Sequence, residues 1–380
     1  MNKGKITQSA IARALNVAPM TVSAALSGKG EQYKLSAETI RKICDYAAEH
    51  GYIRNAAARQ LRNGNALHVG LIIETRNSYG FASSIALDYI LNELNKCGIN
   101  VSIAGGATFL VCMHRLREQG CNTIIVFTAI SEFGTTADFH QKACRLCSGI
   151  DCYALNYVYP RFYDKLAMPI YRMGVDRIGV TNLLLDAFDC SNDDYLLDAH
   201  CHLESMAMLG KDVKTADELR KSMLRRFHPD ALLPVVDGLS TGDYAAVGKA
   251  WFKYYQQISL TRKIKTIIVR DDRIAAVLIS QALHNNIRIP EDLQIIGFDD
   301  LDLGEFLQVP LTSWGIPWMQ HARLALDAIL HKTEIPHDTI STPIFSWRKS
   351  AVLSAEKHSE LMQKLQQISF NMEYIQSVGK

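Results

Sequence analysis

Apolar residues recur at helical spacing three times within residues 7–50, separated by short polar turns. The first helix is predicted over residues 8–15, where Thr7 can cap the N-terminus and Asn16 suits the left-handed conformation that ends a helix. Its apolar face consists of Ile11, Ala12, Ala14 and Leu15. The pattern therefore predicts a short amphipathic helix at the start of the chain.

Two further helices follow at short intervals. Pro19 fits the first turn of a second helix that runs to about residue 27. Ser36 caps a third helix over residues 37–50, and Gly51 stops it. Two helices joined by three or four residues form a helix-turn-helix, in which the second helix lies in the DNA major groove. The first part of the chain is therefore predicted to be an all-α helix-turn-helix head.

From Leu67 onward, continuous apolar runs alternate with amphipathic helices, which indicates parallel sheets covered by helices on both faces. Strands are predicted at residues 67–73, 99–105, 122–127, 151–156, 195–199, 231–236, 265–269 and 293–298. Helices are predicted at residues 83–96, 110–119, 137–147, 176–188, 216–227, 245–255 and 274–284. These strands are too many for one short sheet, so we expect an α/β body of two Rossmann-like lobes.

Charge separates the head from the body. Residues 1–65 hold ten lysines and arginines against four acidic residues, a net charge of +6, whereas the whole chain of 380 residues has a net charge of +2. Neutralising DNA phosphates requires such localised basic character. The alternative is a small helical bundle with a solvated basic face.

Several classes of protein are excluded by what the sequence lacks. No apolar run approaches the roughly 20 residues of a membrane span, and the first residues do not form a signal peptide, so we expect a cytoplasmic protein with no membrane partner. No glycine-rich phosphate loop or nucleophile elbow follows a predicted strand, so we expect neither an enzyme nor a cofactor. Strand alternation at His200, Cys201 and His202 prevents three metal ligands from converging.

The order of residues in the head is more specific than its charge. The pattern is Ala12-x-x-Leu15-Asn16-Val17-Ala18-x-x-Thr21-Val22-Ser23-x-Ala25-Leu26, followed by Gly51-Tyr52-Ile53-Arg54-Asn55-x-x-Ala58-x-x-Leu61. It closely resembles the DNA-binding head of LacI-family transcriptional regulators. The resemblance includes the hinge segment that follows the third helix.

The resemblance implies how this head would contact DNA. The hinge becomes helical only on DNA, where Leu61 would wedge into the minor groove and Ala58 would let two hinge helices approach. The alternative for Leu61 is an ordinary contact with the body. Ala24 stands where many relatives carry arginine, and its methyl group can touch thymine but cannot pair with guanine. The implied DNA-binding residues are Thr7, Pro19, Met20, Thr21, Ser23, Ala24, Lys29, Asn55, Ala58, Arg59, Leu61 and Arg62.

Residues 265–314 resemble the same family, with a strand, an acidic pair, a helix, an Ile-Pro-x-Asp turn, a strand and Gly-Phe-Asp-Asp. The resemblance implies the periplasmic-binding-protein fold, two lobes joined by three crossings with an effector cleft between them. The implied effector residues are Asn77, Tyr79, Phe81, Asp176, Lys214, Asp271 and Asp299, where Lys214 substitutes for an arginine of the relatives. Carboxylates with aromatic side chains favour a neutral sugar or polyol. As alternatives, Asp271 caps the following helix and Asp299 merely orders its turn.

The predicted domains are a head at residues 1–52, a hinge at 53–65, a body at 66–353 and a helical extension at 354–380. The predicted lobes comprise residues 66–172 with 300–317, and residues 173–299 with 318–353. In the extension, apolar residues form a heptad seam at Leu361, Leu365, Ile368, Met372 and Ile375. We expect this helix to pair dimers into a tetramer; the alternative is a helix packed on its own body.

Together these features predict a dimeric regulator, a repressor that binds double-stranded operator DNA and responds to a small-molecule effector. The rival prediction is a sugar-binding or sugar-transforming α/β protein whose basic head has another role.

Overall fold

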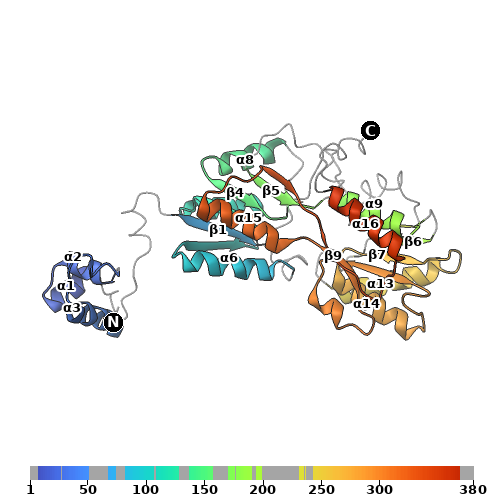
Figure 1. The fold of residues 1–380 in the computed structure, drawn as a ribbon, viewed down its shortest axis with the longest axis horizontal. Helices are drawn as coiled ribbons and strands as arrows, with labels where there is room; N and C mark the ends of the chain where they lie inside the picture. Colours follow the sequence, from blue (N-terminus) through green and yellow to red (C-terminus); the bar gives the residue numbers. More distant parts are fainter. Residues whose placement is uncertain are drawn as a thin grey trace. The chain divides into compact units, whose positions relative to one another are not determined.

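The computed structural model divides the chain into two compact units, Met1–Ala66 and Leu67–Lys380 (Figure 1). The described residues are 7–26, 28–50, 67–73, 82–106, 108–127, 137–156, 170–175, 177–190, 194–198, 231–234, 236 and 243–368. Each unit has its own hydrophobic core. None of the described helices is long and apolar enough to cross a lipid bilayer.

The first unit contains the predicted helix-turn-helix. Its helices are α1 (Gln8–Leu15), α2 (Pro19–Leu26) and α3 (Ala37–Glu49). The Thr7 side chain accepts a hydrogen bond from the Ala10 N–H at 3.1 Å, and Asn16 ends α1 with a left-handed φ of 51°. The Ser36 hydroxyl caps α3 by accepting from the Thr39 N–H at 3.1 Å. The core consists of Ile11, Ala12, Val22, Ala25, Ile43 and Ala47. The predicted caps are therefore confirmed.

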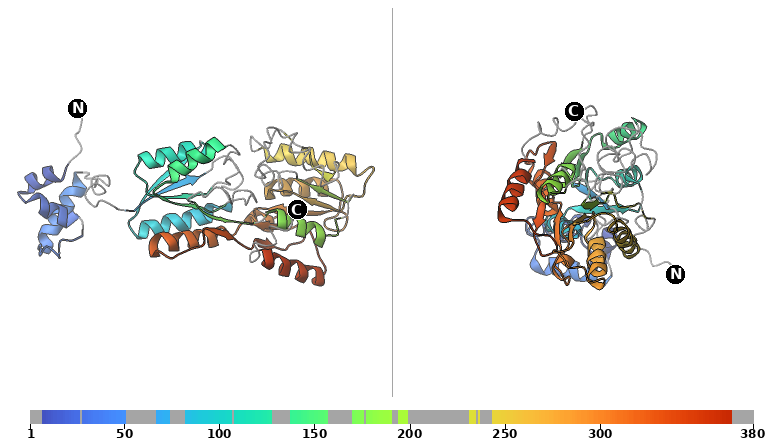
Figure 2. Two further views of the ribbon diagram at one scale, coloured as in Figure 1. Left: turned by 90° about the horizontal axis from the view of Figure 1, so that it is seen from above. Right: turned by 90° about the vertical axis from the view of Figure 1, so that its right-hand side faces the viewer.

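The second unit contains two sheets. The first has the strand order β10-β5-β4-β3-β1-β2, and its strand pairs are parallel. Its strands are β1 (His68–Ile73), β2 (Asn100–Gly105), β3 (Thr123–Val126), β4 (Asp151–Ala154), β5 (Tyr171–Gly174) and β10 (Asp338–Ile340). Its helices are α6 (Ser84–Lys96), α7 (Phe109–Glu118), α8 (Ala137–Cys147) and α15 (Trp318–His331). Figure 2 shows α6 and α15 on one face of this sheet and α7 and α8 on the other.

The second sheet has the order β11-β9-β8-β7-β6, and only β11 runs antiparallel to its neighbour. Its strands are β6 (Tyr195–Leu197), β7 (Thr266–Ile268), β8 (Gln294–Phe298), β9 (Thr312–Gly315) and β11 (Ile344–Ser346). The surrounding helices are α9 (Arg177–Ala187), α13 (Tyr244–Ile258), α14 (Asp272–His284) and α16 (Ala355–Ile368). The predicted strand at residues 231–236 forms only an isolated bridge, from Leu232 to Leu197. The parallel two-sheet α/β body is therefore confirmed.

The sheets correct the predicted lobe boundaries. Residues 300–317 were assigned to the first lobe, yet β9 pairs with β8 in the second sheet. Residues 318–353 were assigned to the second lobe, yet α15 packs on α6 and β10 pairs with β5 in the first sheet. The physical reason is that the chain leaves the second sheet only after β9 and returns after β10. Among the described elements the chain thus passes between the sheets three times, at β5 to α9, β9 to α15 and β10 to β11.

Helix α16 favours the alternative prediction, a helix packed on its own body, over an oligomerisation helix. It packs against α9, and the seam residues Leu361 and Leu365 are 2% and 0% exposed within the core of the body. Lys357 forms an ion pair with Asp189 at the end of α9. Leu361 and Leu365 of the seam are therefore covered by the same chain. Met372 and Ile375 lie outside the described residues.

We expect Leu365→Ala to lower the free energy of unfolding by roughly 2–5 kcal/mol, because it opens a cavity in the core of the body. Chemical denaturation measures this change, and light scattering measures the mass of the native protein, which should stay unchanged. Leu260→Ala is the control, since Leu260 is 86% exposed and the substitution should change stability by less than about 0.5 kcal/mol. A smaller native mass at unchanged stability would instead support the prediction that this helix mediates oligomerisation.

Candidate DNA-binding head and ligand cleft

Helix α2 presents a largely apolar surface at its first turn. Met20 is 63% exposed and Pro19 is also exposed, whereas Thr21 and Ser23 are half-buried. Lys29, beyond the end of α2, is exposed. These positions leave Pro19 and Met20 as the exposed side chains among the predicted base-contacting residues on the helix.

Ala24, a predicted DNA-binding residue, lies on the buried side of α2. Its side chain is only 5% exposed, because the α2 residues Val22, Ala24 and Ala25 face the interior of the head. Its carbonyl accepts a hydrogen bond from the Lys29 N–H at 3.1 Å. Little of the Ala24 side chain is therefore accessible, and its contact with DNA stays a prediction.

Ten predicted site residues lie outside the described residues. In the hinge these are Asn55, Ala58, Arg59, Leu61 and Arg62. In the body these are Asn77, Tyr79, Phe81, Asp176 and Lys214. Their roles stay predictions.

Asp271 and Asp299 follow the carboxyl ends of the neighbouring strands β7 and β8, the edge at which open α/β sheets bind ligands. Asp271 is fully buried and caps α14, accepting from the Arg273 N–H at 2.8 Å. Its two carboxylate oxygens also accept from the Arg273 guanidinium, at 3.1 and 2.9 Å. The alternative prediction, a helix cap, is therefore confirmed, and Arg273 engages both oxygens of this carboxylate.

Asp299 is held differently. Its backbone adopts a φ of 107°, a region that side chains other than glycine rarely occupy, and its N–H donates to the Trp314 carbonyl at 2.8 Å. The residue is 6% exposed, and its buried Oδ2 has no hydrogen-bond partner. Burial, and then the nearby carboxylates of Asp271 and Asp272, raise the pKa of Asp299 well above its usual range. Oδ2 is thus an unpaired, buried acceptor just after the carboxyl end of a strand, and a ligand hydroxyl that donates a hydrogen bond would satisfy it.

Arg177 is the main site residue that the sequence analysis missed. It begins α9, is 6% exposed, and its guanidinium carbon lies 4.8 Å from the centre of the Phe298 ring. It donates to Asn156 Oδ1 at 3.1 Å, and Asn156 follows β4 of the first sheet. Its charge lowers the pKa of Asp299 against the larger effect of burial. Arg177 therefore connects the strand ends of the first sheet with those of the second.

The same edge contains further paired charges. Asp198, after β6, is 1% exposed and lies 3.5 Å from the guanidinium of Arg270, which follows β7. Asn156 is 1% exposed, and its Nδ2 has no hydrogen-bond partner. A polar residue directly after an apolar strand was the available sequence signal for Asn156, Asp198 and Arg270. The strand ends together supply unpaired donor and acceptor atoms next to neutralised charges.

Aromatic rings surround these polar groups. Phe298 contacts Trp314 edge to face at 4.4 Å between ring centres, and Phe127, after β3, stacks on Trp318 at 6.3 Å. The Arg273 guanidinium lies 3.8 Å from the centre of the Tyr244 ring. Apolar ring faces beside buried hydrogen-bonding groups form the type of lining that small-molecule sites use.

Asp272 supports the turn that carries Asp299. Its Oδ2 accepts from the Leu301 N–H at 2.7 Å, and its Oδ1 lies 2.6 Å from the Ser313 hydroxyl. Gly297 is required beside it, because a Cβ there would lie 2.1 Å from Asp272 Oδ1. Burial raises the pKa of Asp272 to about 7. Among the described residues no cluster of His, Cys, Asp or Glu side chains could hold a metal ion.

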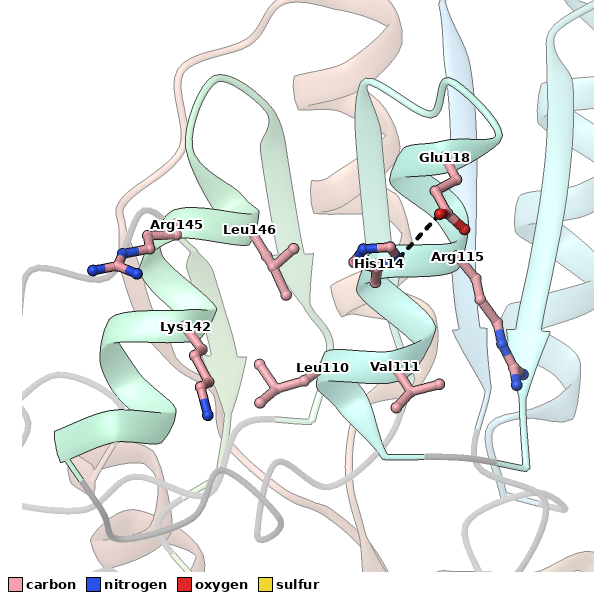
Figure 3. A pocket seen from close by; sticks show the side chains of 8 residues that line it. All are labelled: Leu110, Val111, His114, Arg115, Glu118, Lys142, Arg145 and Leu146. Atoms are coloured by element: carbon pink, nitrogen blue, oxygen red, sulfur yellow. Dashed lines mark ion pairs between the residues drawn. The ribbon is translucent and has the colours of Figure 1, made fainter.

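A separate open hollow lies between α7 and α8 (Figure 3). Its sides carry Leu110, Val111, His114, Arg115, Glu118, Lys142, Arg145 and Leu146. His114 and Glu118 form an exposed ion pair at 3.5 Å. Neither Asp271 nor Asp299, the predicted effector residues that the structure describes, lines this hollow, so the strand-end cluster is the candidate ligand site.

Comparisons with known proteins agree with this architecture. Residues 194–351 match the periplasmic binding protein-like domain family. The chain is 30% identical over 124 residues to the catabolite repressor/activator of Salmonella typhimurium, and 30% identical over 144 residues to the ribose operon repressor of Escherichia coli. The predicted resemblance to the LacI family is confirmed.

Solved structures of LacI-type regulators share the fold over 91% of the chain. The lac repressor dimer bound to operator and an anti-inducer superimposes with a TM-score of 0.65 at 17% identity, covering 91% of this chain and 99% of that one. A LacI-family regulator from Silicibacter pomeroyi gives a TM-score of 0.62 at 14% identity, covering 91% and 99%.

The sequence similarity to the curated LacI-type relatives is shorter. The matches cover 32% and 37% of this chain, and the chain spans only 36% and 43% of the length of the two repressors. These matched proteins are regulators rather than enzymes, in agreement with the expectation for this chain.

Asp272 should make stability depend on pH. Because its pKa is about 7 in the folded protein and near 3.8 when unfolded, the folded state binds the extra proton between these values. Its contribution to stability is therefore complete below about pH 4 and is lost as the pH rises through 7. Asp272→Asn should flatten this slope by up to about 1.4 kcal/mol per pH unit.

Urea unfolding at half-unit intervals from pH 4 to 8 measures the effect. Asp302→Asn, at an exposed carboxylate in the same loop, is the control and should keep the wild-type slope. An unchanged slope in Asp272→Asn would show that this carboxyl group is ionised throughout the range.

Proposed function

We propose that this protein is a DNA-binding transcriptional regulator whose affinity for its operator is controlled by a small neutral sugar or polyol bound between the two lobes. The observation that carries the proposal is the group of buried polar residues at the strand ends. There Asp299 and Asn156 each have an unpaired polar atom, and aromatic rings lie beside them. Such a site is built to bind a ligand, and it belongs to a chain that begins with a helix-turn-helix.

The DNA-binding part rests on three features of the head. Its helices have the required order, its basic charge is concentrated within residues 1–65, and its sequence resembles the LacI family through the hinge. The exposed Met20 can contact thymine methyl groups, while Thr21 and Ser23 can bind phosphates. An apolar reading surface would select its site through shape and methyl contacts more than through paired hydrogen bonds to guanine.

The class of effector follows from charge. Arg273 and Arg270 already neutralise Asp271 and Asp198, and Arg177 lies near Asp299, so the site offers no excess charge to an ionic ligand. What it does offer is an unpaired acceptor on Asp299 and an unpaired donor on Asn156. A hydroxyl group donates to the first and accepts from the second, and an aromatic ring covers the apolar face of a sugar. The name of the ribose operon repressor among the relatives supports a sugar.

Control of DNA binding would work by population shift. A ligand that binds one orientation of the lobes better than another shifts the chain towards that orientation. In a homodimer this would separate or realign the paired hinge segments around Leu61 and change the affinity for the operator. The rival proposal is a sugar-binding or sugar-transforming protein whose basic head has a role other than binding DNA.

DNA capture tests the first part of the proposal. Fragments of the source genome are incubated with the protein at low salt, retained fragments are sequenced, and the affinity of a short palindromic fragment is measured at rising salt. We expect a steep loss of affinity with salt. Leu61→Ala should weaken binding roughly tenfold, whereas Leu260→Ala, on the exposed surface of the body, should not. Failure to retain any genomic fragment at low salt would favour the rival.

A melting screen against neutral sugars and polyols tests the second part. The effector should raise the melting temperature, since a ligand at 100 times its Kd stabilises the folded state by about 2.7 kcal/mol. Asp299→Asn should abolish or strongly reduce the shift in melting temperature, because the amide nitrogen that replaces Oδ2 cannot accept a hydrogen bond from the ligand hydroxyl. The exposed Asp302→Asn is the matched control and should keep it. Equal shifts in wild type and Asp299→Asn would place the ligand elsewhere.

A further inference from the structure

The three connections between the lobes meet at a buried hydrogen-bonded pair, His321 and Ser341. Ser341 follows β10, on the connection that leads to β11, and His321 lies in the first turn of α15, after the connection from β9. Ser341 is 3% exposed and His321 is fully buried. Both residues therefore lie in the interior, where three separate stretches of chain pass between the sheets.

Ser341 links two of these connections. Its N–H donates to the Gly174 carbonyl at 2.8 Å, which extends the pairing of β10 with the end of β5, the strand before the connection to α9. Its hydroxyl lies 2.8 Å from His321 Nε2. A single residue thus contacts the end of β5 through its backbone and the start of α15 through its side chain.

The orientation of the His321 ring follows from its partners. Nδ1 lies 2.6 Å from the Leu155 carbonyl, which can only accept, so Nδ1 carries the proton and donates. Nε2 must then accept, and the Ser341 hydroxyl donates to it. Burial lowers the pKa of His321 to about 4, so the ring is neutral near pH 7, as this arrangement requires. Leu155 follows β4, and its N–H donates to Val126 at 2.9 Å, so the chain of bonds is anchored in the first sheet.

We propose that the His321–Ser341 pair is the fixed pivot about which the two lobes reorient, because it fastens all three connections to one point of the first sheet. Both side chains have all their hydrogen-bonding atoms at this point engaged. Separating them would leave a buried donor and a buried acceptor unpaired. Motion of the lobes therefore keeps this point closed and bends the connections beyond it, on the side of the second sheet. His321 and Ser341 are positioning residues and do not contact the proposed ligand.

Distances between the lobes test the pivot. Spin labels are introduced through an unnatural amino acid at Lys96 on the first lobe and Leu260 on the second, both exposed, in the full chain. Ser341→Ala removes the hydroxyl donor, and His321→Leu removes both side-chain bonds at similar volume. Each variant should broaden the wild-type distance distribution at least twofold, and the double variant should be no broader than His321→Leu alone.

Ser350→Ala is the matched control. Ser350 is a fully buried serine whose hydroxyl donates to the Ile295 carbonyl at 2.6 Å and accepts from the Thr312 N–H at 2.8 Å, all within the second lobe. This variant loses equivalent bonds and should keep the narrow distribution. The proposal is overturned if the distance distributions of Ser341→Ala and His321→Leu are as narrow as that of the wild type. It is also overturned if Ser350→Ala broadens the distribution equally.

Amide hydrogen exchange of the wild-type protein gives a test that needs no variant to fold. As part of the pivot, the Ser341 N–H should exchange within about threefold of the rate of the Ile267 N–H in the core of the second sheet, since neither opens without wider unfolding. Exchange at Ser341 that is more than a hundredfold faster would show that the point opens locally, and would falsify the pivot.

Discussion

The strand-end cluster depends on the compensation of buried carboxylates by arginines. Removing a carboxylate from water costs several kcal/mol unless a partner offsets the loss. Asp198 and Asp271 meet this requirement through Arg270, which follows the neighbouring strand β7, and Arg273, which lies in α14. Asp299 does not meet it, because the nearby Arg177 donates a hydrogen bond to Asn156. Of Asp198, Asp271 and Asp299 at the described strand ends, Asp299 is therefore the carboxylate that a ligand can complete.

The sequence predicted strands such as β1, β3, β7 and β8, but it missed the strands β10 and β11 and the 14-residue helix α15. Strands such as β1, β3, β7 and β8 are continuous apolar runs, buried on both faces, so their composition alone identifies them. The strands β10 and β11 have three residues each and are only partly buried, so they lack that signal. Their existence depends on pairing with β5 and β9, which no local pattern reveals. The lobe boundaries were wrong for the same reason, since the chain changes sheets where those short strands lie.

The site residues divide in a similar way. The resemblance to the LacI family implied Asp271 and Asp299, and each of them follows an apolar strand. It did not find Arg177, whose role arises only when α9 of one lobe approaches β4 of the other. Leu365 shows a different limit: spacing correctly indicated one face of a helix, but not whether another chain or the protein's own core would cover it. Periodicity identifies a face, and only packing identifies its partner.

The cleft and the connections between the lobes share a strand. The turn that carries Asp299 is bonded to β9 at two points, through the Trp314 carbonyl and through Ser313, which Asp272 also binds. Immediately after β9 the chain crosses to α15, whose first turn contains His321. A ligand that pairs with Asp299 would therefore act on a strand whose far end is fastened to the first sheet. Because the turn already has an unfavourable backbone conformation at Asp299, small changes in its hydrogen bonding can shift the balance between lobe orientations.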